Sequence, residues 1–366
     1  MKAALFCTTR YEGPASHTTW PAACDTYTAE WAEKSMARTM EQFKLGDEVG
    51  FDWLTVAEHH FAPFSMTPNP MVMAATLINS TSRAKIALLG PDIPILNPIR
   101  VAEELAMIDT LSGGRVVAGF MRGSPNEYVT YNINPAESRE RFEEAYKIIK
   151  MAWTQKQPFG WQGRYYEYRS ICVWPRPVQQ PHPPIYMSVA SPEAGEFAAK
   201  NHLNAGFAFT TLQIASKAAD FYRQKCNEYG WQPEPEQIVY RIGMHCTEDD
   251  EEAINDLTRT GGGQPAVGLS FRNRSVESAV AQSGFYGRDV DTQRGRLQSR
   301  GEIASRIEKG QVLVGTPETI LKQIKRIRDE LGCGVLDLSL GAQLGEKTLR
   351  SIELFGEKVL PRMHEL

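Results

Sequence analysis

The chain has 366 residues, of which 42% are apolar and 23% are charged, values usual for folded globular proteins that argue against extended disorder. Its formal net charge is −4, and Lys and Arg are interspersed with Asp and Glu along the sequence. The sequence shows no cluster of Lys and Arg that could bind a polyanion, so nucleic acid is not expected as a partner.

The cysteines and the apolar runs bear on the compartment. None of the six cysteines forms a C-x-x-C pair, so neither a disulfide framework nor a zinc site is indicated. No apolar run reaches the roughly 18 residues that a membrane helix needs. The first residues, MKAALFCTT, lack the apolar stretch and cleavage site of a signal peptide. We therefore expect a cytoplasmic protein with no membrane segment.

Short runs of β-branched and apolar residues alternate with longer helical patterns. This alternation is typical of a parallel sheet whose strands are joined by helices. The expected strands span residues 2–8, 52–57, 85–90, 115–120, 185–189, 205–210, 238–246 and 335–340. Because eight such strands close a barrel, the sequence predicts the α/β class and a single (β/α)8 TIM barrel domain over residues 1–366.

Helical periodicity follows each expected strand. Several of these segments begin with a capping residue followed by proline, as in Asn97-Pro98 and Thr316-Pro317. The expected helices span residues 33–49, 70–81, 98–111, 138–154, 191–201, 213–229, 248–259 with 316–331, and 346–359.

Two segments do not fit the alternation and are interpreted as insertions after strand four and strand seven. Residues 156–184 combine Gly and aromatic residues with a proline-rich run, which predicts a hairpin followed by an extended passage. Residues 261–311 begin with three glycines and are polar and Arg-rich, without an apolar face. Long loops of this kind are often functional. We interpret 261–311 as a mobile lid, with an idle surface insertion as the alternative.

In barrels of this type the functional residues lie at the carboxyl ends of the strands. Four expected strands therefore bring their last residues to one rim. These ends are Glu58-His59-His60-Phe61, Gly90-Pro91-Asp92, Gly119-Phe120-Met121-Arg122-Gly123-Ser124 and Ser188-Val189-Ala190-Ser191.

Two histidines at the end of strand two are candidates for proton transfer. An imidazole titrates near neutral pH, so His59 or His60 can take up or release a proton. Neighbouring residues on a strand point to opposite faces, so at most one of them faces the barrel axis. No metal site is expected from this pair, and a structural role for either histidine alone stays open.

Arg139 opens the fourth helix directly after Ser138, where free backbone N–H groups and a guanidinium together suit a phosphate. An ordinary surface arginine beside Glu140 is the alternative. The chain contains neither a G-x-G-x-x-G sequence after a strand nor a G-x-x-x-x-G-K-[ST] loop, so no dedicated dinucleotide or nucleoside triphosphate domain is expected.

Taken in order, these residues resemble the bacterial-luciferase-like flavin-dependent monooxygenase family across nearly the whole chain. An E-H-H-F sequence at 58–61 is followed by S-G-G-R-x-x-x-G-x-x-R-G at 112–123 and by V-G-T-P at 314–317. The matching segments are 50–61, 97–123, 138–146, 184–201, 314–324 and 354–363.

The resemblance implies a flavin-dependent oxygenase. Members of the family use reduced FMN (FMNH2) and O2, through a C4a-peroxyflavin kept from water, to oxygenate a small organic substrate. Because the chain lacks the G-x-G-x-x-G sequence that binds nicotinamide dinucleotides, the resemblance suggests that a separate flavin reductase supplies the reduced FMN. By family position, the strand-two histidine that assists proton transfer is His59. The cofactor-binding residues implied in the same way are Gly90, Met121, Arg139, Val189, Ala190 and Ser191, with Arg139 and Ser191 at the phosphate.

The sequence departs from luciferase itself at Met121, which stands where luciferase has a reactive cysteine, so light emission is not implied. Two alternatives stay open: an oxidoreductase that uses the deazaflavin F420, and a flavin-binding protein without catalysis. Related proteins pair through the helices expected at 70–81 and 98–111, so we expect a homodimer.

Overall fold

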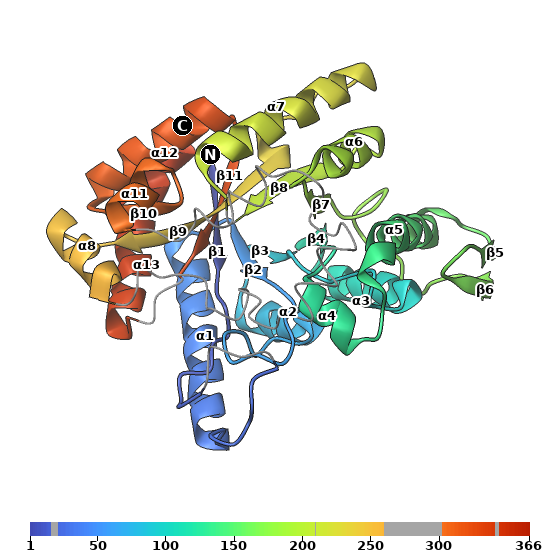
Figure 1. Ribbon diagram of the computed structural model, residues 1–366, viewed down its shortest axis with the longest axis horizontal. Helices are drawn as coiled ribbons and strands as arrows, with labels where there is room; N and C mark the ends of the chain where they lie inside the picture. Colours follow the sequence, from blue (N-terminus) through green and yellow to red (C-terminus); the bar gives the residue numbers. More distant parts are fainter. Residues whose placement is uncertain (16–20, 209, 260–301, 341–343) are drawn as a thin grey trace.

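The computed structural model describes residues 1–15, 21–208, 210–259, 302–340 and 344–366. Within these ranges, eight parallel strands close into a barrel that helices surround (Figure 1). In order around the ring, the strands are β1 (Lys2–Phe6), β2 (Trp53–Val56), β3 (Lys85–Leu88), β4 (Val116–Phe120), β7 (Ile185–Ser188), β8 (Asn204–Ala208), β9 (Ile238–Cys246) and β11 (Val335–Ser339). Parallel pairing of β8 with β9 and of β11 with β1 closes the ring. The predicted (β/α)8 barrel is therefore confirmed.

Helices pack around the outside of the strands. They are α1 (Ala29–Val49), α2 (Pro70–Ser80), α3 (Pro98–Leu111), α4 (Pro125–Thr130), α5 (Ser138–Thr154), α6 (Pro192–Lys200), α7 (Leu212–Glu228), α8 (Asp250–Arg259), α11 (Ile303–Glu308), α12 (Pro317–Leu331), α13 (Glu346–Lys358) and α14 (Leu360–His364), with the single-turn helices η1 (Pro135–Glu137) and η2 (Pro235–Gln237). Every predicted helix is confirmed. The sequence analysis missed α4, α11 and α14, because five or six residues are too few to show helical periodicity.

Capping side chains explain where several helices begin. Asn69 and Asn97 each accept hydrogen bonds from two backbone N–H groups in the first turn, and a proline follows each of them. Ser191 and Thr316 cap α6 and α12 in the same way, with one bond each. A cap of this kind contributes about 1 kcal/mol. The caps therefore fix where these four helices begin.

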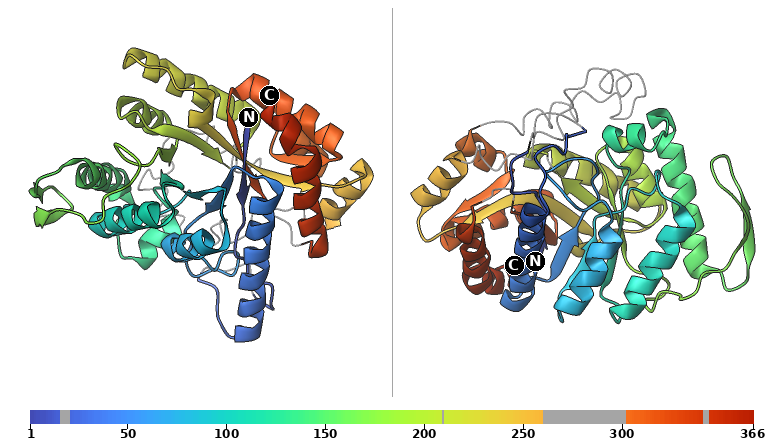
Figure 2. Two further views of the ribbon diagram at one scale, coloured as in Figure 1. Left: turned by 180° about the vertical axis from the view of Figure 1, so that it is seen from behind. Right: turned by 90° about the horizontal axis from the view of Figure 1, so that it is seen from below.

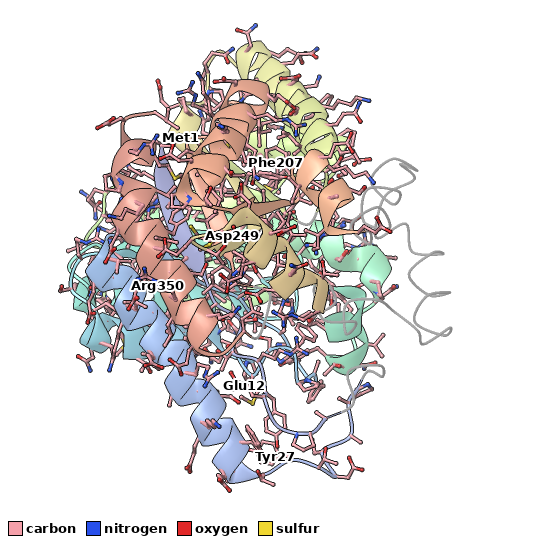
Figure 3. All side chains as sticks on the ribbon, turned by 90° about the vertical axis from the view of Figure 1, so that its left-hand side faces the viewer. Met1, Glu12, Tyr27, Phe207, Asp249 and Arg350 are labelled. Atoms are coloured by element: carbon pink, nitrogen blue, oxygen red, sulfur yellow. The ribbon has the colours of Figure 1, made fainter. Side chains whose placement is uncertain are left out.

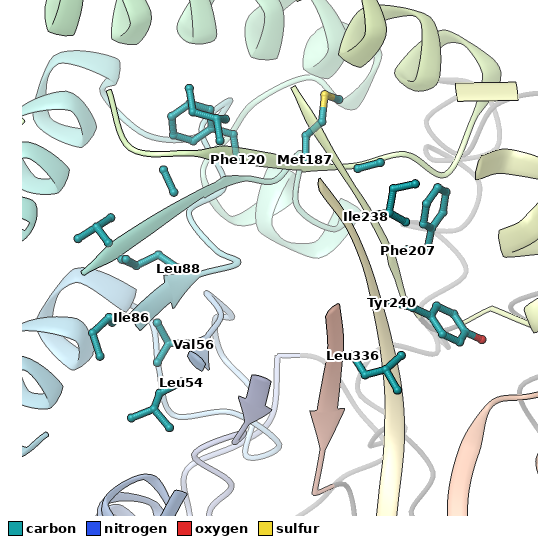
Figure 4. Packing of buried hydrophobic residues seen from close by; sticks show 14 of the residues in the cluster. Leu54, Val56, Ile86, Leu88, Phe120, Met187, Phe207, Ile238, Tyr240 and Leu336 are labelled. Atoms are coloured by element: carbon teal, nitrogen blue, oxygen red, sulfur yellow. The ribbon is translucent and has the colours of Figure 1, made fainter. Parts of the chain in front are cut away.

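Two apolar layers hold the barrel. The outer layer lies between strands and helices (Figure 4) and includes Leu54, Val56, Ile86, Leu88, Phe120, Met187, Phe207, Ile238, Tyr240 and Leu336. A second set, on the alternate strand positions, fills the barrel interior: Ala4, Trp53, Ala87, Leu89, Val117, Tyr186, Val239 and Val335. There the rings of Trp53 and Tyr186 meet edge to face, with centroids 5.5 Å apart. Since each large apolar side chain contributes roughly 1.5–3 kcal/mol on burial, these layers make the barrel a rigid support for its strand ends.

The structure corrects the sequence prediction before α12. Val312–Gly315 form a further parallel strand, β10, paired with the last four residues of β9. Apolar side chains of α8, α11 and β10 pack together, and residues 302–311 form a helix and a turn. The rest of the predicted lid, 261–301, lies outside the described residues.

The predicted hairpin after α5 is confirmed as β5 (Phe159–Gln162) and β6 (Glu167–Ile171). The carboxylate of Glu144 on α5 holds its turn. It accepts a hydrogen bond from the indole N–H of Trp161 at 2.9 Å and from the backbone N–H of Tyr166 at 3.1 Å. The hairpin is thereby fixed to the outer side of the barrel, at the edge of the molecule (Figure 1).

The two ends of the barrel are distinguished by the termini and by the first loop. The chain ends lie side by side (Figure 2), and the ammonium group of Met1 donates to the carbonyl of Met363 at 2.9 Å. At the other end, Glu12 and Tyr27 mark the loop from β1 to α1 (Figure 3). The carboxyl ends of the strands open toward this second end, where a barrel of this type carries its site.

Candidate active site

The carboxyl ends of β2, β3 and β4 are joined by direct contacts. The backbone N–H of Asp92, after β3, donates to Oε2 of Glu58, after β2, at 3.3 Å. Asp92 also forms an isolated parallel bridge with Met121, after β4. The three strand ends therefore meet at one rim, as predicted.

Gly90 follows β3 and lies close to Gly119 of β4. A cis peptide bond joins it to Leu89. A Cβ atom at Gly90 would lie 1.8 Å from the carbonyl oxygen of Leu88, and one at Gly119 would lie 2.5 Å from the same oxygen. Only glycine fits at either position. At Gly90 the rim therefore presents bare backbone.

His59 is held by a buried carboxylate that the sequence analysis did not assign. Its Nδ1 lies 3.3 Å from Oε1 of Glu127 on α4, and the Glu127 side chain is only 3% exposed. The other oxygen of Glu127 accepts hydrogen bonds from the backbone N–H of Ser124, at 2.7 Å, and from the Ser124 hydroxyl. The ring of Phe64 lies 5.0 Å from the imidazole. These contacts fix one edge of the ring, and the His59 side chain remains 22% exposed.

His60 points to a different set of partners. Its Nε2 lies 3.0 Å from Oε1 of Glu58, and both side chains are buried. Its Nδ1 lies 3.4 Å from the hydroxyl of Tyr131. The two histidines thus diverge, as neighbouring strand residues should, and His60 has the contacts of a structural residue.

Three buried carboxyl groups share this rim, and the pKa values of two of them, Asp92 and Glu127, are shifted in opposite directions. Burial, reinforced by the negative charges of Glu58 and Glu127, raises the pKa of Asp92 well above its usual value. Burial would also raise the pKa of Glu127, but its hydrogen bonds and charge interaction with His59 and its bonds from Ser124 lower that pKa below the usual value. Asp92 therefore keeps its proton more readily than a free carboxyl, and Glu127 is the ionised member beside His59.

Small side chains leave the upper barrel open along β7 and β8. Tyr186 faces the interior, and Ser188, two residues later on the same strand, faces the same side but is exposed. Ala190, two residues after β7, and Ala208, the last residue of β8, are exposed as well. Met121 packs against the interior layer from the end of β4. A ligand can therefore lie above the interior aromatic rings.

A positively charged group lies at the start of α6. Nη2 of Arg139 is 3.7 Å from Oε2 of Glu193. A hydrogen bond from the hydroxyl of Ser191, one from the Glu193 backbone and the charges of Arg139 and Arg122 lower the pKa of Glu193. Two arginines, Ser191 and the first turn of α6 therefore act on one carboxylate, and the same groups suit a phosphate.

An ion pair inside the barrel supports the residue before Gly90. Nε of Arg241 donates to Oδ2 of Asp337 at 2.6 Å, and its guanidinium lies 3.7 Å from the ring centroid of Phe6. A further nitrogen of Arg241 donates to the carbonyl of Leu89 at 3.4 Å. Arg241 thus links the barrel interior to the backbone directly before Gly90.

The predicted site residues divide by the direction of their side chains. His59, Met121, Arg139 and Ser191 lie at the rim, whereas the side chain of Val189 is 1% exposed and packs in the outer layer. Only the backbone of Val189 is available to a ligand. Glu127, Arg122 and Glu193 also lie at this rim, and no sequence pattern assigned them a role. The spacing Ser124-x-x-Glu127 is that of a capping box, and it could have revealed α4.

Over the part of the chain that the structure describes, no cluster of three or more His, Cys, Asp or Glu residues is arranged to hold a metal ion. No helix in the same ranges is long and apolar enough to cross a membrane.

Comparison with known sequences decides the family. The sequence model described as luciferase-like monooxygenase matches residues 1–333. The chain belongs to this family. Among curated relatives, the alkanal monooxygenase alpha chain of Photorhabdus luminescens is 28% identical over 340 residues, covering 88% of this chain and 90% of that protein.

Other relatives match over shorter stretches. The oxygenase component of flavin-dependent trigonelline monooxygenase from Acinetobacter baylyi is 26% identical over 60% of this chain and 62% of its own length. A protein of Sinorhizobium fredii, y4wF, is 33% identical over 43% of this chain and 46% of its own length. The chain thus spans less than two thirds of each of these two relatives.

Solved structures share the fold over almost the entire chain. The monooxygenase RslO1 from Streptomyces bottropensis aligns with a TM-score of 0.76 and 25% identity, over 99% of both chains. The oxygenating constituent of 3,6-diketocamphane monooxygenase from Pseudomonas putida, in complex with FMN, gives 0.73 at 17% identity over 99% and 98% of the two chains. An F420-dependent secondary alcohol dehydrogenase gives 0.71 at 17% identity with the same coverage. The family match supports an oxidoreductase activity for the chain.

Proposed function

We propose that this luciferase-like protein is a monooxygenase that uses reduced FMN and O2 to oxygenate a small organic substrate. The observation that carries the proposal is that His59, held by an ionised carboxylate, shares one barrel rim with the positive group at the start of α6. A proton-transfer group and an anion site at opposite parts of a single open barrel end fit a flavin and its phosphate.

The residues of the rim suit FMN in their chemistry. Arg139, Arg122 and Ser191 would hold the phosphate in place of the Glu193 carboxylate. The bare backbone at Gly90 and the side chain of Met121 would lie against the ring system. Bound reduced FMN would supply the two electrons that activate O2.

The chain's own residues would orient the reacting groups and move protons. Nδ1 of His59 is engaged by Glu127, so Nε2 is the ring nitrogen that is open to a ligand. The buried interior beneath the rim would exclude water from the side of the ring system that faces it. His59 would therefore exchange a proton at Nε2 without the carboxylate entering the reaction.

An F420-dependent oxidoreductase is the second candidate, since solved structures of F420-dependent enzymes share the fold. The anion site favours FMN. A terminal phosphate monoester carries nearly two negative charges at neutral pH, whereas the phosphodiester of F420 carries one. Two arginines near one helix start match the greater charge.

We propose two protein partners. The trigonelline relative is named as an oxygenase component, and a separate reductase would likewise deliver reduced FMN to this chain. A second copy of the chain would cover α2 and α3, where Val72, Met107 and Leu111 are 65%, 53% and 60% exposed. Exposed apolar side chains grouped on adjacent helices are typical of an interface.

The test mixes the protein with photoreduced FMN, or with chemically reduced F420, and then with O2-containing buffer. A monooxygenase should consume O2 with FMN and, when candidate substrates are added, give products that contain one atom from 18O2 by mass spectrometry. Hydride transfer from F420 with no 18O incorporation would replace the proposal by the second candidate. FMN binding without product from a broad substrate panel would favour a flavin-binding protein that has lost catalysis.

A further inference from the structure

Glu127 has two oxygens with two separate tasks. Oε2 accepts the hydrogen bonds of Ser124 that start α4, which form a capping box, and Oε1 faces Nδ1 of His59. The cap alone would explain a glutamate here, since capping boxes are common at helix starts. It does not explain why the second oxygen is buried against an imidazole.

The charge of Glu127 decides which atom donates in this contact. Its pKa is lowered below the usual value, chiefly because its bonds to His59 and Ser124 outweigh the effect of burial. An ionised carboxylate can only accept hydrogen bonds. Nδ1 of His59, at 3.3 Å, must therefore carry the proton, and in the neutral ring Nε2 is left with its lone pair.

We propose that Glu127 is a positioning residue that holds His59 in the Nδ1–H tautomer and so leaves Nε2 as the proton acceptor of the site. Phe64 restricts the ring from another side, and Ser124 keeps the carboxylate in place. The proposal assigns a role to α4, a helix of six residues between β4 and α5. It rests on the proposed function only where it calls Nε2 the reacting atom.

A single substitution separates the two tasks. In Glu127→Gln, the amide oxygen must stay with the backbone N–H of Ser124, because the flipped amide would place its NH2 donor against the donating N–H. Glutamine is also an accepted residue of the capping box. The amide NH2 then faces Nδ1 and can only donate. His59 must accept at Nδ1 and carry its proton on Nε2, so the variant keeps the helix start and reverses the tautomer.

The experiment measures the tautomer directly and needs no turnover. Protein labelled with 15N-histidine is studied by long-range 1H–15N correlation at a pH where the ring is neutral, and His59→Asn identifies the His59 signals. The wild type should show a protonated Nδ1 and a bare Nε2, and Glu127→Gln should show the reverse. Ser124→Ala, which removes a bond to the other oxygen only, should keep the wild-type tautomer.

The same tautomer in the wild type and in Glu127→Gln would overturn the proposal, as would a wild-type ring protonated at Nε2. Thermal denaturation of both variants checks that α4 and the barrel are retained. In turnover, Glu127→Gln should lower kcat by on the order of 10²-fold with little change in KM, the effect of losing a general base. A reversed tautomer with unchanged turnover would refute His59 as the reacting group and leave its positioning by Glu127 standing.

Discussion

Nη2 of Arg139 lies 3.7 Å from Oε2 of Glu193, so the first turn of α5 reaches the first turn of α6. Both side chains are partly exposed, at 31% and 62%. A surface ion pair of this kind contributes roughly 0–1 kcal/mol and is easily exchanged for a better anion. The pair therefore marks where a phosphate would enter, and each partner gives a prediction of opposite sign.

Replacing Arg139 by Ala should weaken the binding of FMN by about 1.5–3 kcal/mol, the usual scale for a hydrogen bond to a charged group. Riboflavin has no phosphate, so its affinity should change little. Fluorescence titration with both ligands measures the difference. Arg141→Ala is the matched control, because Arg141 lies on the same helix and is paired with Glu137. Equal losses for FMN and riboflavin would place Arg139 outside the phosphate site.

Replacing Glu193 by Gln should strengthen the binding of FMN by about two- to fivefold at low salt, because the carboxylate competes with the phosphate for Arg139. The gain should shrink as salt is added, since the charges are exposed. Glu196→Gln, one turn further along α6, controls for the loss of a negative charge from the helix. A tighter complex in both variants would mean that net charge alone is responsible.

The sequence predicted the parts of this protein that repeat a pattern. Strands such as Ile238–Cys246 are marked by their apolar residues, and helices such as Pro98–Leu111 by a capping residue and proline, so both were found with accurate bounds. β10 was missed because its four residues adjoin the cap of α12 and follow a polar segment. Alternation with Met187 could have shown that the Val189 side chain faces outward.

The electrostatics of the site could not be read from the sequence. Asp92 and Glu127 are separated from Glu58 by 34 and 69 residues, and only the closed barrel brings the three carboxyl groups together. Their protonation depends on burial and on mutual charge, which no local pattern reports. His59 could be selected by its place at a strand end, but its partner came from a helix too short to predict.

His59 itself should be required for turnover and not for flavin binding. His59→Ala removes the group that would move a proton at the rim, so the rate of product formation should fall by about 10²-fold or more. The affinity for reduced FMN should stay within a few-fold. His364, which is 43% exposed near the C-terminus, gives a control variant, His364→Ala. Turnover at the wild-type rate in His59→Ala would remove this histidine from the mechanism.

The exposed apolar residues of α2 and α3 should hold a homodimer together. The double variant Val72→Glu, Met107→Glu would place two charges in that interface. Removing these charges from water is costly, so the interface should not form. Light scattering coupled to size-exclusion chromatography should then give the mass of a dimer for the wild type and of a monomer for the variant. Ile254→Glu, at a 39% exposed position on α8, should leave the mass unchanged. A monomeric wild type would end the argument for pairing.

The unusual protonation of Asp92 should appear in the pH dependence of stability. Burial, then the charges of Glu58 and Glu127, raise the pKa of Asp92 well above its usual value, so the folded protein keeps a proton that the unfolded chain releases above about pH 4. A group with a raised pKa stabilises the fold fully below its unfolded pKa, and this contribution is lost as the pH rises toward the folded pKa.

Asp92→Asn has nearly the same shape and cannot titrate, so it escapes that loss. The Tm of the variant minus that of the wild type should therefore increase steadily from pH 4 to pH 8, as measured by thermal denaturation at several pH values without flavin. Asp220→Asn, at a 76% exposed carboxylate, is the control and should give a difference that does not vary with pH. A flat difference for Asp92→Asn would mean that Asp92 ionises in the folded protein as it does in the unfolded chain, and that burial and the neighbouring charges do not raise its pKa.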